Sequence, residues 1–126
     1  MVDGSTQLVG LIAWPVEHTL SPTMHNAVFD ALGLNWRYVP LPVAPGQVER
    51  AVRGLGALGF RGANVTVPHK RAVMPVLDSI GPGARVLGAV NTLVIEQRAN
   101  EPPVIGGTNT DANGFVGALR QGGFEP

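Results

Sequence analysis

The chain has 126 residues, enough for one ordinary domain with a sizeable core, and its nine lysines and arginines balance nine aspartates and glutamates. Balanced charge without a basic run argues against nucleic acid or an anionic membrane surface as a partner. The chain has no cysteine, which excludes a disulfide framework and a thiolate metal site.

The chain opens with a strand pattern and then a helix pattern. Residues 7–14 form a nearly continuous apolar run of strand length, suited to a sheet covered on both faces. The run is too short to cross a membrane, and no basic region or small-residue cleavage site marks it as a signal peptide. Ser21 and Pro22 predict a helix start, with serine as the cap and proline at the first helical position. This helix is expected to end at Gly33.

Strand and helix patterns continue to alternate through the rest of the chain. Near the end of the chain, two strand-like runs are separated by a polar turn, which predicts a hairpin. The remaining expected elements are strands at 36–41 and 63–67, helices at 47–58 and 69–77, a helical turn at 84–89, hairpin strands at 91–96 and 104–108, and a last helix at 110–121 with Phe115, Val116 and Leu119 inward.

This order predicts an α/β fold. Strands that alternate with helices favour an open twisted sheet in three layers, mostly parallel, with one antiparallel hairpin. No internal repeat and no internal linker is visible. We expect the last five residues, 122–126, to be a connection that leads to a further segment.

Residues 54–59 match the dinucleotide-binding fingerprint G-x-G-x-x-G, and Asp78 lies near the distance expected of a ribose-binding acid. That fingerprint works only when a strand precedes it and a helix follows, so that phosphates meet a helix N-terminus. Here a helix precedes and a strand follows. We therefore interpret the glycines as the end of the helix, with Gly59 just past it, and expect no cofactor-binding residue in this chain.

The most informative stretch is Gly62 to Lys70, read as G-A-N-V-T-V-P-H-K. Its first part alternates like a strand, and Pro68 stops the strand because proline lacks a ladder donor. Lys70 would then fall in the first turn of a helix, where the macrodipole disfavours a cation by ~0.3–1 kcal/mol. Such a lysine needs an anionic partner, a ligand or solvent. The corner lies where open α/β sheets bind small molecules.

Five further polar residues are expected near Lys70 in one cleft: Thr19, Ser21, Thr66, Asn91 and Asp111. Most of them stand at strand or helix ends, where a parallel sheet gathers its loops. Hydroxyls, an amide and one cation suit a small polyhydroxy acid.

Each of these five also has a purely structural interpretation, which stays open on sequence alone. Ser21 serves as an N-cap, and Thr19 as an ordinary loop residue. Thr66 fits a strand by propensity and Asn91 fits a turn. Asp111 is favoured by the dipole at a helix start.

The three histidines, His18, His25 and His69, lack metal-ligand spacing with any nearby carboxylates. We therefore expect no metal site.

Four ordered motifs resemble shikimate dehydrogenase across the whole chain. They are H-T-L-S-P-x-M-H-N at 18–26, G-A-N-V-T-V-P-H-K at 62–70, G-A-V-N-T-L at 88–93 and G-x-N-T-D at 107–111. The resemblance implies an N-terminal domain of the aminoacid-dehydrogenase-like fold, which binds substrate and carries the catalytic residues over 1–126. It also implies a C-terminal NADP-binding Rossmann domain that this chain lacks, so that the chain alone is expected to bind no cofactor and to be inactive.

The resemblance further implies the residue roles. Thr19 and Ser21 would bind the substrate carboxylate, and Thr66, Lys70, Asn91 and Asp111 would contact the ring hydroxyls, with Lys70 and Asp111 as the catalytic pair. NADPH would reduce 3-dehydroshikimate to shikimate, in the shikimate pathway of aromatic amino-acid and chorismate biosynthesis. Asp111 would favour the charged form of the Lys70 ammonium, which donates the proton.

Two other functions stay open. The first of the two loop hydroxyls is serine in most of the family and is Thr19 here, which leaves open a quinate or dual-specificity dehydrogenase. A non-catalytic module that binds shikimate-like acids is the alternative from another class. We expect a cytoplasmic protein whose partners are the small-molecule substrate and the missing domain, with a homodimer as a further possibility and no nucleic acid or membrane partner.

Overall fold

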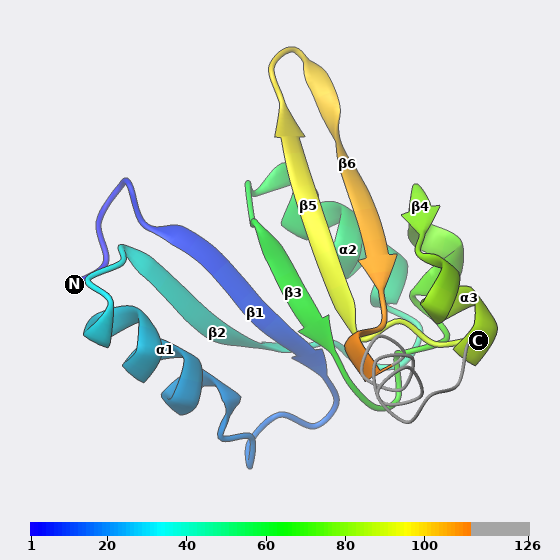
Figure 1. The fold of residues 1–126 in the computed structure, drawn as a ribbon, viewed down its shortest axis with the longest axis horizontal. Coiled ribbons are helices and arrows are strands. Elements are labelled where there is room, and N and C mark those ends of the chain that lie inside the picture. The colour runs from blue at the N-terminus through cyan, green and yellow to red at the C-terminus, as the bar shows by residue number, and fades with distance from the viewer. Residues whose placement is uncertain (112–126) are drawn as a thin grey trace, which may run out of the picture.

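The computed structural model describes residues 1–111, and within this range a mixed sheet has the strand order β2-β1-β3-β5-β6-β4 (Figure 1). The elements are β1 (Gln7–Ala13), α1 (Ser21–Ala31), β2 (Trp36–Pro42), α2 (Val48–Ala57), β3 (Gly62–Val65), the 3₁₀ helix η1 (Met74–Val76), β4 (Ser79–Ile80), α3 (Pro82–Leu87), β5 (Thr92–Arg98) and β6 (Glu101–Thr108).

The pairing confirms the predicted α/β class with a mostly parallel sheet and one hairpin. β1 runs parallel to β2 and β3, and β4 runs parallel to β6. β5 is antiparallel to β3 as well as to its hairpin partner β6, so one reversed strand accounts for both antiparallel pairings. The sequence pattern did not predict β4, which is two residues long.

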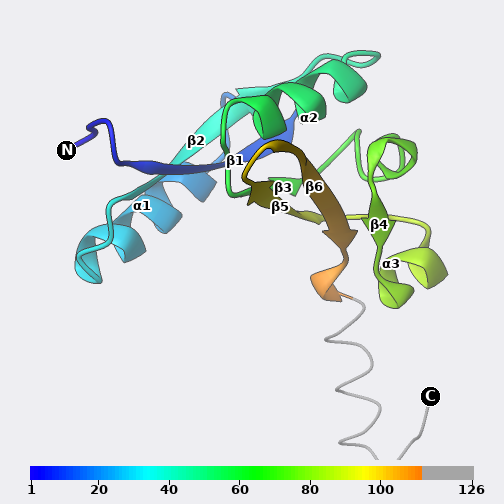
Figure 2. The ribbon, with the colours of Figure 1, turned by 90° about the horizontal axis from the view of Figure 1, so that it is seen from above.

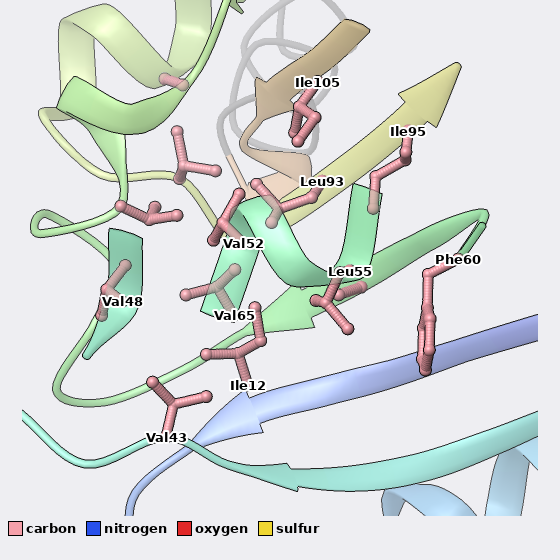
Figure 3. Packing of buried hydrophobic residues seen from close by; sticks show 14 residues of the cluster. Ile12, Val43, Val48, Val52, Leu55, Phe60, Val65, Leu93, Ile95 and Ile105 are labelled. Atoms are coloured by element: carbon pink, nitrogen blue, oxygen red, sulfur yellow. The ribbon is translucent and has the colours of Figure 1, made fainter. Parts of the chain in front are cut away.

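Helices cover both faces of the sheet, and the two layers of side chains differ in size. α1 and α2 lie on opposite faces (Figure 2). On the α2 side, Val52 and Leu55 pack against Ile12, Val65 and Leu93 from three strands (Figure 3). Fully burying one such side chain contributes about 1.5–3 kcal/mol. The larger α2 cluster therefore supplies most of the hydrophobic stabilisation.

The α1 side of the sheet has a much smaller buried cluster. It consists of Leu11, Ala13 and Tyr38, with Phe29 of α1 packed against it. Within the described residues, α1 itself has no buried residue. This face therefore has room for polar side chains between the helix and the sheet.

α2 follows the prediction closely, and its glycines do what the sequence analysis expected of them. Gly54 and Gly56 lie inside the helix, and Gly59 follows its end with φ +81°. A Cβ on Gly56 would stand 3.0 Å from Pro103 Cγ, so the absent side chain lets the helix lie close to β6. The fingerprint-like glycines serve helix termination and packing.

The predicted helix over 69–77 is wrong. Residues 70–73 form turns, and only η1 follows, with i to i+3 bonds from Val76 N–H to Val73 O and from Leu77 N–H to Met74 O. Pro75 explains the difference, because it lacks the N–H that a second α-helical turn would need at that position. Lys70 therefore does not stand in a helix's first turn, and the conflict with a macrodipole does not arise.

The predicted cap of α1 is also wrong by one position. The N-cap is Leu20, so Ser21 is the first helical residue and Pro22 the second. Thr19 Oγ1 accepts the Ser21 backbone N–H at 3.2 Å. Since threonine satisfies this N–H, the Ser21 hydroxyl is released from capping.

The last predicted helix begins in the described part of the chain. Thr110 and Asp111 are helical, whereas the rest of the predicted helix, with Phe115, Val116 and Leu119, lies outside the described residues. Among residues 1–111, no helix is both long and apolar enough to span a membrane.

Candidate functional site

The predicted site residues come from loops at one edge of the sheet. β1, β3 and β6 end at this edge and β5 begins there (Figure 1). Thr66 follows β3, Asn91 precedes β5, and Asp111 lies three residues after β6. The carboxyl ends of strands are the usual ligand-binding edge of an open α/β sheet.

Thr66 is fixed beside the end of β1. Its backbone N–H donates to Ile12 O at 3.0 Å, and Trp14 N–H donates to Val67 O at 3.4 Å. These bonds extend the parallel pairing of β1 and β3 past the strand ends. The loop that carries Thr19 and Ser21 leaves β1 at the same point, so it starts alongside Thr66.

Asn91 connects three segments. Its backbone carbonyl accepts Val65 N–H at 2.8 Å, and its own N–H donates to Thr108 O at 3.1 Å. Its side-chain amide bonds Thr110 twice, accepting the backbone N–H at 3.0 Å and donating to Oγ1 at 3.0 Å. Asn91 thereby ties the ends of β3 and β6 to the helical turn that contains Asp111.

Asn109 completes the anchoring of that turn. It is buried, with 4% of its surface exposed, and its Nδ2 donates to Ala89 O at 2.9 Å while Oδ1 accepts Asp111 N–H at 2.9 Å. Asp111 is therefore held through its backbone, and the residue is exposed.

Lys70 lies in the turn after β3 and is half-buried. Its carbonyl accepts Val90 N–H at 2.9 Å, so its backbone lies directly beside the residue that precedes Asn91. The adjacent His69 is only 1% exposed, and its Nε2 contacts Val43 O at 2.5 Å. A neutral imidazole that donates here would anchor the turn to the loop after β2.

The Lys70 and Asp111 side chains do not form an ion pair within 4.0 Å in the described structure. Their backbones are nevertheless linked through short steps, from Lys70 to Val90 and from Asn91 to Thr110. The turn positions are fixed by backbone bonds, and the two side chains remain available to other partners.

α1 is joined to the same edge through Tyr38, whose backbone bonds Asn26 of that helix. The Tyr38 phenol O–H donates to Asn64 Oδ1 at 2.9 Å. Asn64 lies in β3 two residues before Thr66, a spacing that keeps strand side chains on one face. Burial raises the pKa of Tyr38 to about 12, although the nearby Ser21 hydroxyl acts in the opposite direction.

Tyr38 is itself held from three sides. Asn26 of α1 accepts the Tyr38 backbone N–H at 2.8 Å and donates to its carbonyl at 2.9 Å, in the manner of a neighbouring strand. The His25 ring stacks on the phenol ring, with 4.2 Å between centroids and 7° between planes. His25 and Asn26 belong to one of the sequence motifs but no role was predicted for them there, and neither Tyr38 nor Asn64 was predicted as a site residue. The polar alternation of Asn64 and Thr66 in an apolar strand was a usable signal.

One hollow on the α1 face lies beside Tyr38 and Asn64. Its volume is about 200 Å³, and its polar lining comes from His25, Tyr38, Asn64 and Thr92. None of the six predicted residues lines it. The segments that carry the predicted residues lie instead at the strand ends.

The described residues offer neither a cluster of metal ligands nor a helix that begins after the glycine fingerprint. Residues 1–111 contain no group of three or more His, Asp or Glu side chains that could hold a metal ion. The G-x-G-x-x-G sequence ends a helix, where the carbonyl end of the dipole repels phosphate. What the arrangement offers is hydroxyls, an amide, one carboxylate and one ammonium, which suit a small oxygen-rich anion.

Comparison with known proteins gives consistent results. A family model described as "Shikimate dehydrogenase substrate binding domain" matches residues 11–93. A shikimate dehydrogenase (NADP(+)) of Rubrobacter xylanophilus is 54% identical over 99% of this chain, and one of Citrifermentans bemidjiense is 49% identical over 99%. The structure of a Listeria monocytogenes shikimate 5-dehydrogenase in complex with shikimate and NAD superposes with a TM-score of 0.81 at 40% identity, covering 98% of this chain and 41% of the other.

The chain matches only part of each relative. It spans 43% of the Rubrobacter protein and 42% of the Citrifermentans protein.

Proposed function

The chain belongs to the family of shikimate dehydrogenase substrate-binding domains, and from this membership we propose that it binds 3-dehydroshikimate and shikimate as part of a longer NADP-dependent shikimate dehydrogenase. In that protein, residues 1–126 would be the substrate-binding and catalytic domain, and a separate domain would bind NADP(H). The reaction would serve the shikimate pathway.

The observation that carries the proposal is the hydrogen-bonded linkage of the four motifs at one sheet edge. Asn91 bonds the turn before Asp111, and Val90 beside it bonds the Lys70 carbonyl. Asn26, in the same motif as Ser21, is linked to the same edge through Tyr38 and Asn64. Motifs up to about ninety residues apart in the chain are thereby brought to one place, as a shared ligand would require.

We assign the residues two tasks. Thr19 and Ser21 bind the substrate carboxylate, because their hydroxyls can donate hydrogen bonds to an anion. The Lys70 ammonium is then left for the reacting oxygen. Thr66 and Asn91 hold ring hydroxyls, and Lys70 with Asp111 forms the catalytic pair.

Lys70 would act at the oxygen that changes between ketone and alcohol. An ammonium beside that oxygen stabilises developing negative charge and donates the proton, and such acid–base groups contribute about 10²–10⁴-fold in rate. Asp111 accepts a hydrogen bond from the ammonium and keeps it charged. NADP(H) does not fit this chain's own glycines, so the redox partner would be held entirely by residues outside it.

Three further parts of the proposal concern the whole protein. Its partner is the NADP-binding domain of the same polypeptide. We place the protein in the cytoplasm, in keeping with its soluble small-molecule substrate. A homodimer is supported by the exposed apolar row of Leu20, Met24 and Val28 along α1.

A second candidate is a dehydrogenase that accepts quinate as well as shikimate. Thr19 Oγ1 already accepts the Ser21 N–H, which fixes the side chain and with it the threonine methyl group. Quinate differs from shikimate near the carbon that bears the carboxylate, which is the part that Thr19 would contact. The position therefore bears on the choice between the two substrates.

The test uses a chimera in which residues 1–126 replace the segment that they match in the Rubrobacter xylanophilus relative. We expect Lys70→Ala to lower kcat by about 10²–10⁴-fold while the Kd for shikimate changes little. Arg71→Ala, the neighbouring exposed cation, is the control and should leave kcat unchanged. An unchanged kcat in Lys70→Ala would remove Lys70 from its catalytic role.

A further inference from the structure

Asn26 of α1 pairs with the backbone of β2 as a residue of a neighbouring strand would. Its Oδ1 accepts the Tyr38 N–H at 2.8 Å, and its Nδ2 donates to the Tyr38 carbonyl oxygen at 2.9 Å. In the sheet that residues 1–111 form, β2 is the outermost strand on this side. One side-chain amide therefore takes the place that a further strand would occupy at Tyr38.

The pairing of β1 with β2 shows which backbone groups of β2 face this open edge. Gln7 N–H donates to Asn35 O at 2.9 Å, and Val43 N–H donates to Ala13 O at 3.0 Å. Because the facing direction alternates along a strand, the odd-numbered residues between Asn35 and Val43 also turn their backbone groups toward β1. The residues that turn outward are 36, 38, 40 and 42.

Two of these outward positions cannot donate a hydrogen bond. Pro40 and Pro42 have no backbone N–H. Tyr38 is therefore the last residue before the carboxyl end of β2 that offers both an outward N–H and an outward carbonyl. A shift of α1 by one outward position toward that end would leave Asn26 Oδ1 without its donor, so the two bonds fix the register of the helix in this direction.

Asn26 shares its face of α1 with Ser21. The half-buried residues of the helix are Ser21, Pro22, Asn26 and Phe29, and their spacing of three and four residues places them on one face. Ser21 is the first residue of the helix, and its N–H is bonded to Thr19 Oγ1. A shift of α1 along β2 would therefore move both hydroxyls.

The other contacts of α1 constrain its register less strictly. All of α1 lies in the described part of the chain, and none of its residues is buried. Asp30 pairs with Arg37 at 2.7 Å, but the Asp30 side chain is 63% exposed, and exposed ion pairs contribute little. His25 and Phe29 meet aromatic rings of β2, and such ring contacts are less directional than paired hydrogen bonds.

We propose that Asn26 is a positioning residue for the carboxylate-binding end of the site. By pairing with the open edge of β2, it fixes α1 along the sheet and thereby sets the positions of Thr19 and Ser21. The proposal rests on the role of these two hydroxyls in the proposed function. Asn26 itself would not need to touch the substrate.

The first test is Asn26→Ala in the chimera. We expect KM for shikimate to rise about three- to tenfold, because the hydroxyls that bind the carboxylate lose their fixed position. We expect kcat to stay unchanged, because Lys70 and Asp111 lie on other segments.

Gln97→Ala is the matched control. Its side-chain amide also bonds backbone groups of another segment, the carbonyls of Gly56 at 3.2 Å and Phe60 at 3.4 Å. Gln97 lies near the end of β5, whereas the site lies where β5 begins. Its loss should leave KM unchanged.

Asn26→Gln separates positioning from simple stabilisation of the edge. Glutamine keeps the amide that Tyr38 needs, so the fold should be retained, but its extra methylene changes the distance between α1 and β2. We expect the Tyr38 amide to stay protected from hydrogen exchange while KM rises with kcat unchanged. A protected amide together with the original KM would show that Asn26 only stabilises the edge, and would overturn the proposal.

A double-mutant cycle with Ser21→Ala tests whether Asn26 acts through the hydroxyls. Asn26→Ala should raise KM by a smaller factor once Ser21 is alanine. A rise by the same factor in both backgrounds would contradict the proposal.

The same variants separate this proposal from the proposed function. If Thr19→Ala and Ser21→Ala both leave KM unchanged, these hydroxyls do not bind the carboxylate, and the role of Asn26 fails with them. If Ser21→Ala raises KM while both Asn26 variants keep the original KM, only the positioning role is wrong.

Discussion

Asn91 shows how one amide can organise a site without being its reactive group. Its backbone continues the sheet between β3 and β6, and its side chain bonds both polar groups of Thr110. Replacing it would leave Thr110 N–H without this partner and would loosen the turn before Asp111. A side chain that is engaged with Thr110 in this way is also set in one orientation toward a ligand.

Tyr38 permits a direct spectroscopic prediction, because it is the single tyrosine of the chain. Its phenolate absorbance should titrate near pH 12 in the folded chain and near its ordinary value of 10.0 in urea. Since folding raises this pKa, the associated stability is complete below about pH 10 and is lost as the pH rises through about 12.

Two pKa units correspond to roughly 2–3 kcal/mol of unfolding free energy. Unfolding measured alongside Tyr38→Phe, which lacks the titrating group, isolates this loss from that of other groups. A midpoint near 10 in the folded chain would show that the phenol is solvated.

At the level of elements, the regular strands and helices could be predicted, whereas the connections could not. Apolar runs and their spacing identified β1, β2, α2 and the hairpin to within a few residues. Pro75 was overlooked as a breaker inside an otherwise helical spacing, and the two residues of β4 carry no pattern of their own. Pro75 was visible in the sequence, whereas β4 depends on pairing with β6 that only the folded chain supplies.

The segments that carry the candidate site could be located from the sequence, but the hydrogen bonds between them could not. The positions of strand ends, together with the family resemblance, predicted Thr19, Ser21, Thr66, Asn91 and Asp111 as site residues. The bond from Tyr38 to Asn64 joins residues of different strands, and no local pattern encodes such a contact. Ser21 was interpreted as a cap, a task that Thr19 performs.

Gly107 illustrates how close packing between elements supports the site. A Cβ at this position would stand 2.9 Å from Val90 Cγ1 and would also meet Leu77 Cδ1. Val90 is fully buried, and its N–H bonds the Lys70 carbonyl. A side chain at 107 would therefore push on the segment that positions Lys70 and Asn91.

We expect Gly107→Ala to lower the free energy of unfolding by about 1–3 kcal/mol, the usual cost of overpacking. Urea unfolding of the chain measures it. Gly4→Ala is the matched control, because no atom lies within 4 Å of a Cβ there, and it should change stability by no more than about 0.5 kcal/mol. Equal effects of the two substitutions would show that the packing around Gly107 adapts without cost.

At the scale of the whole molecule, we expect the chain to form one wall of a cleft. The predicted residues gather at one sheet edge, and the chain spans less than half of its curated relatives. If the rest of the longer protein supplies the second wall, the isolated chain leaves one side of its ligand in water. A free-standing binding module would instead enclose its ligand by itself.

Calorimetric titration of shikimate into the isolated chain and into the chimera tests this most directly. We predict binding to the chimera, abolition of most of it by Ser21→Ala, and binding to the isolated chain that is weaker by about tenfold or more, equivalent to at least about 1.4 kcal/mol. Equally tight binding to the isolated chain would identify a self-sufficient binding module, and no binding to a folded chimera would contradict a shikimate site in this domain.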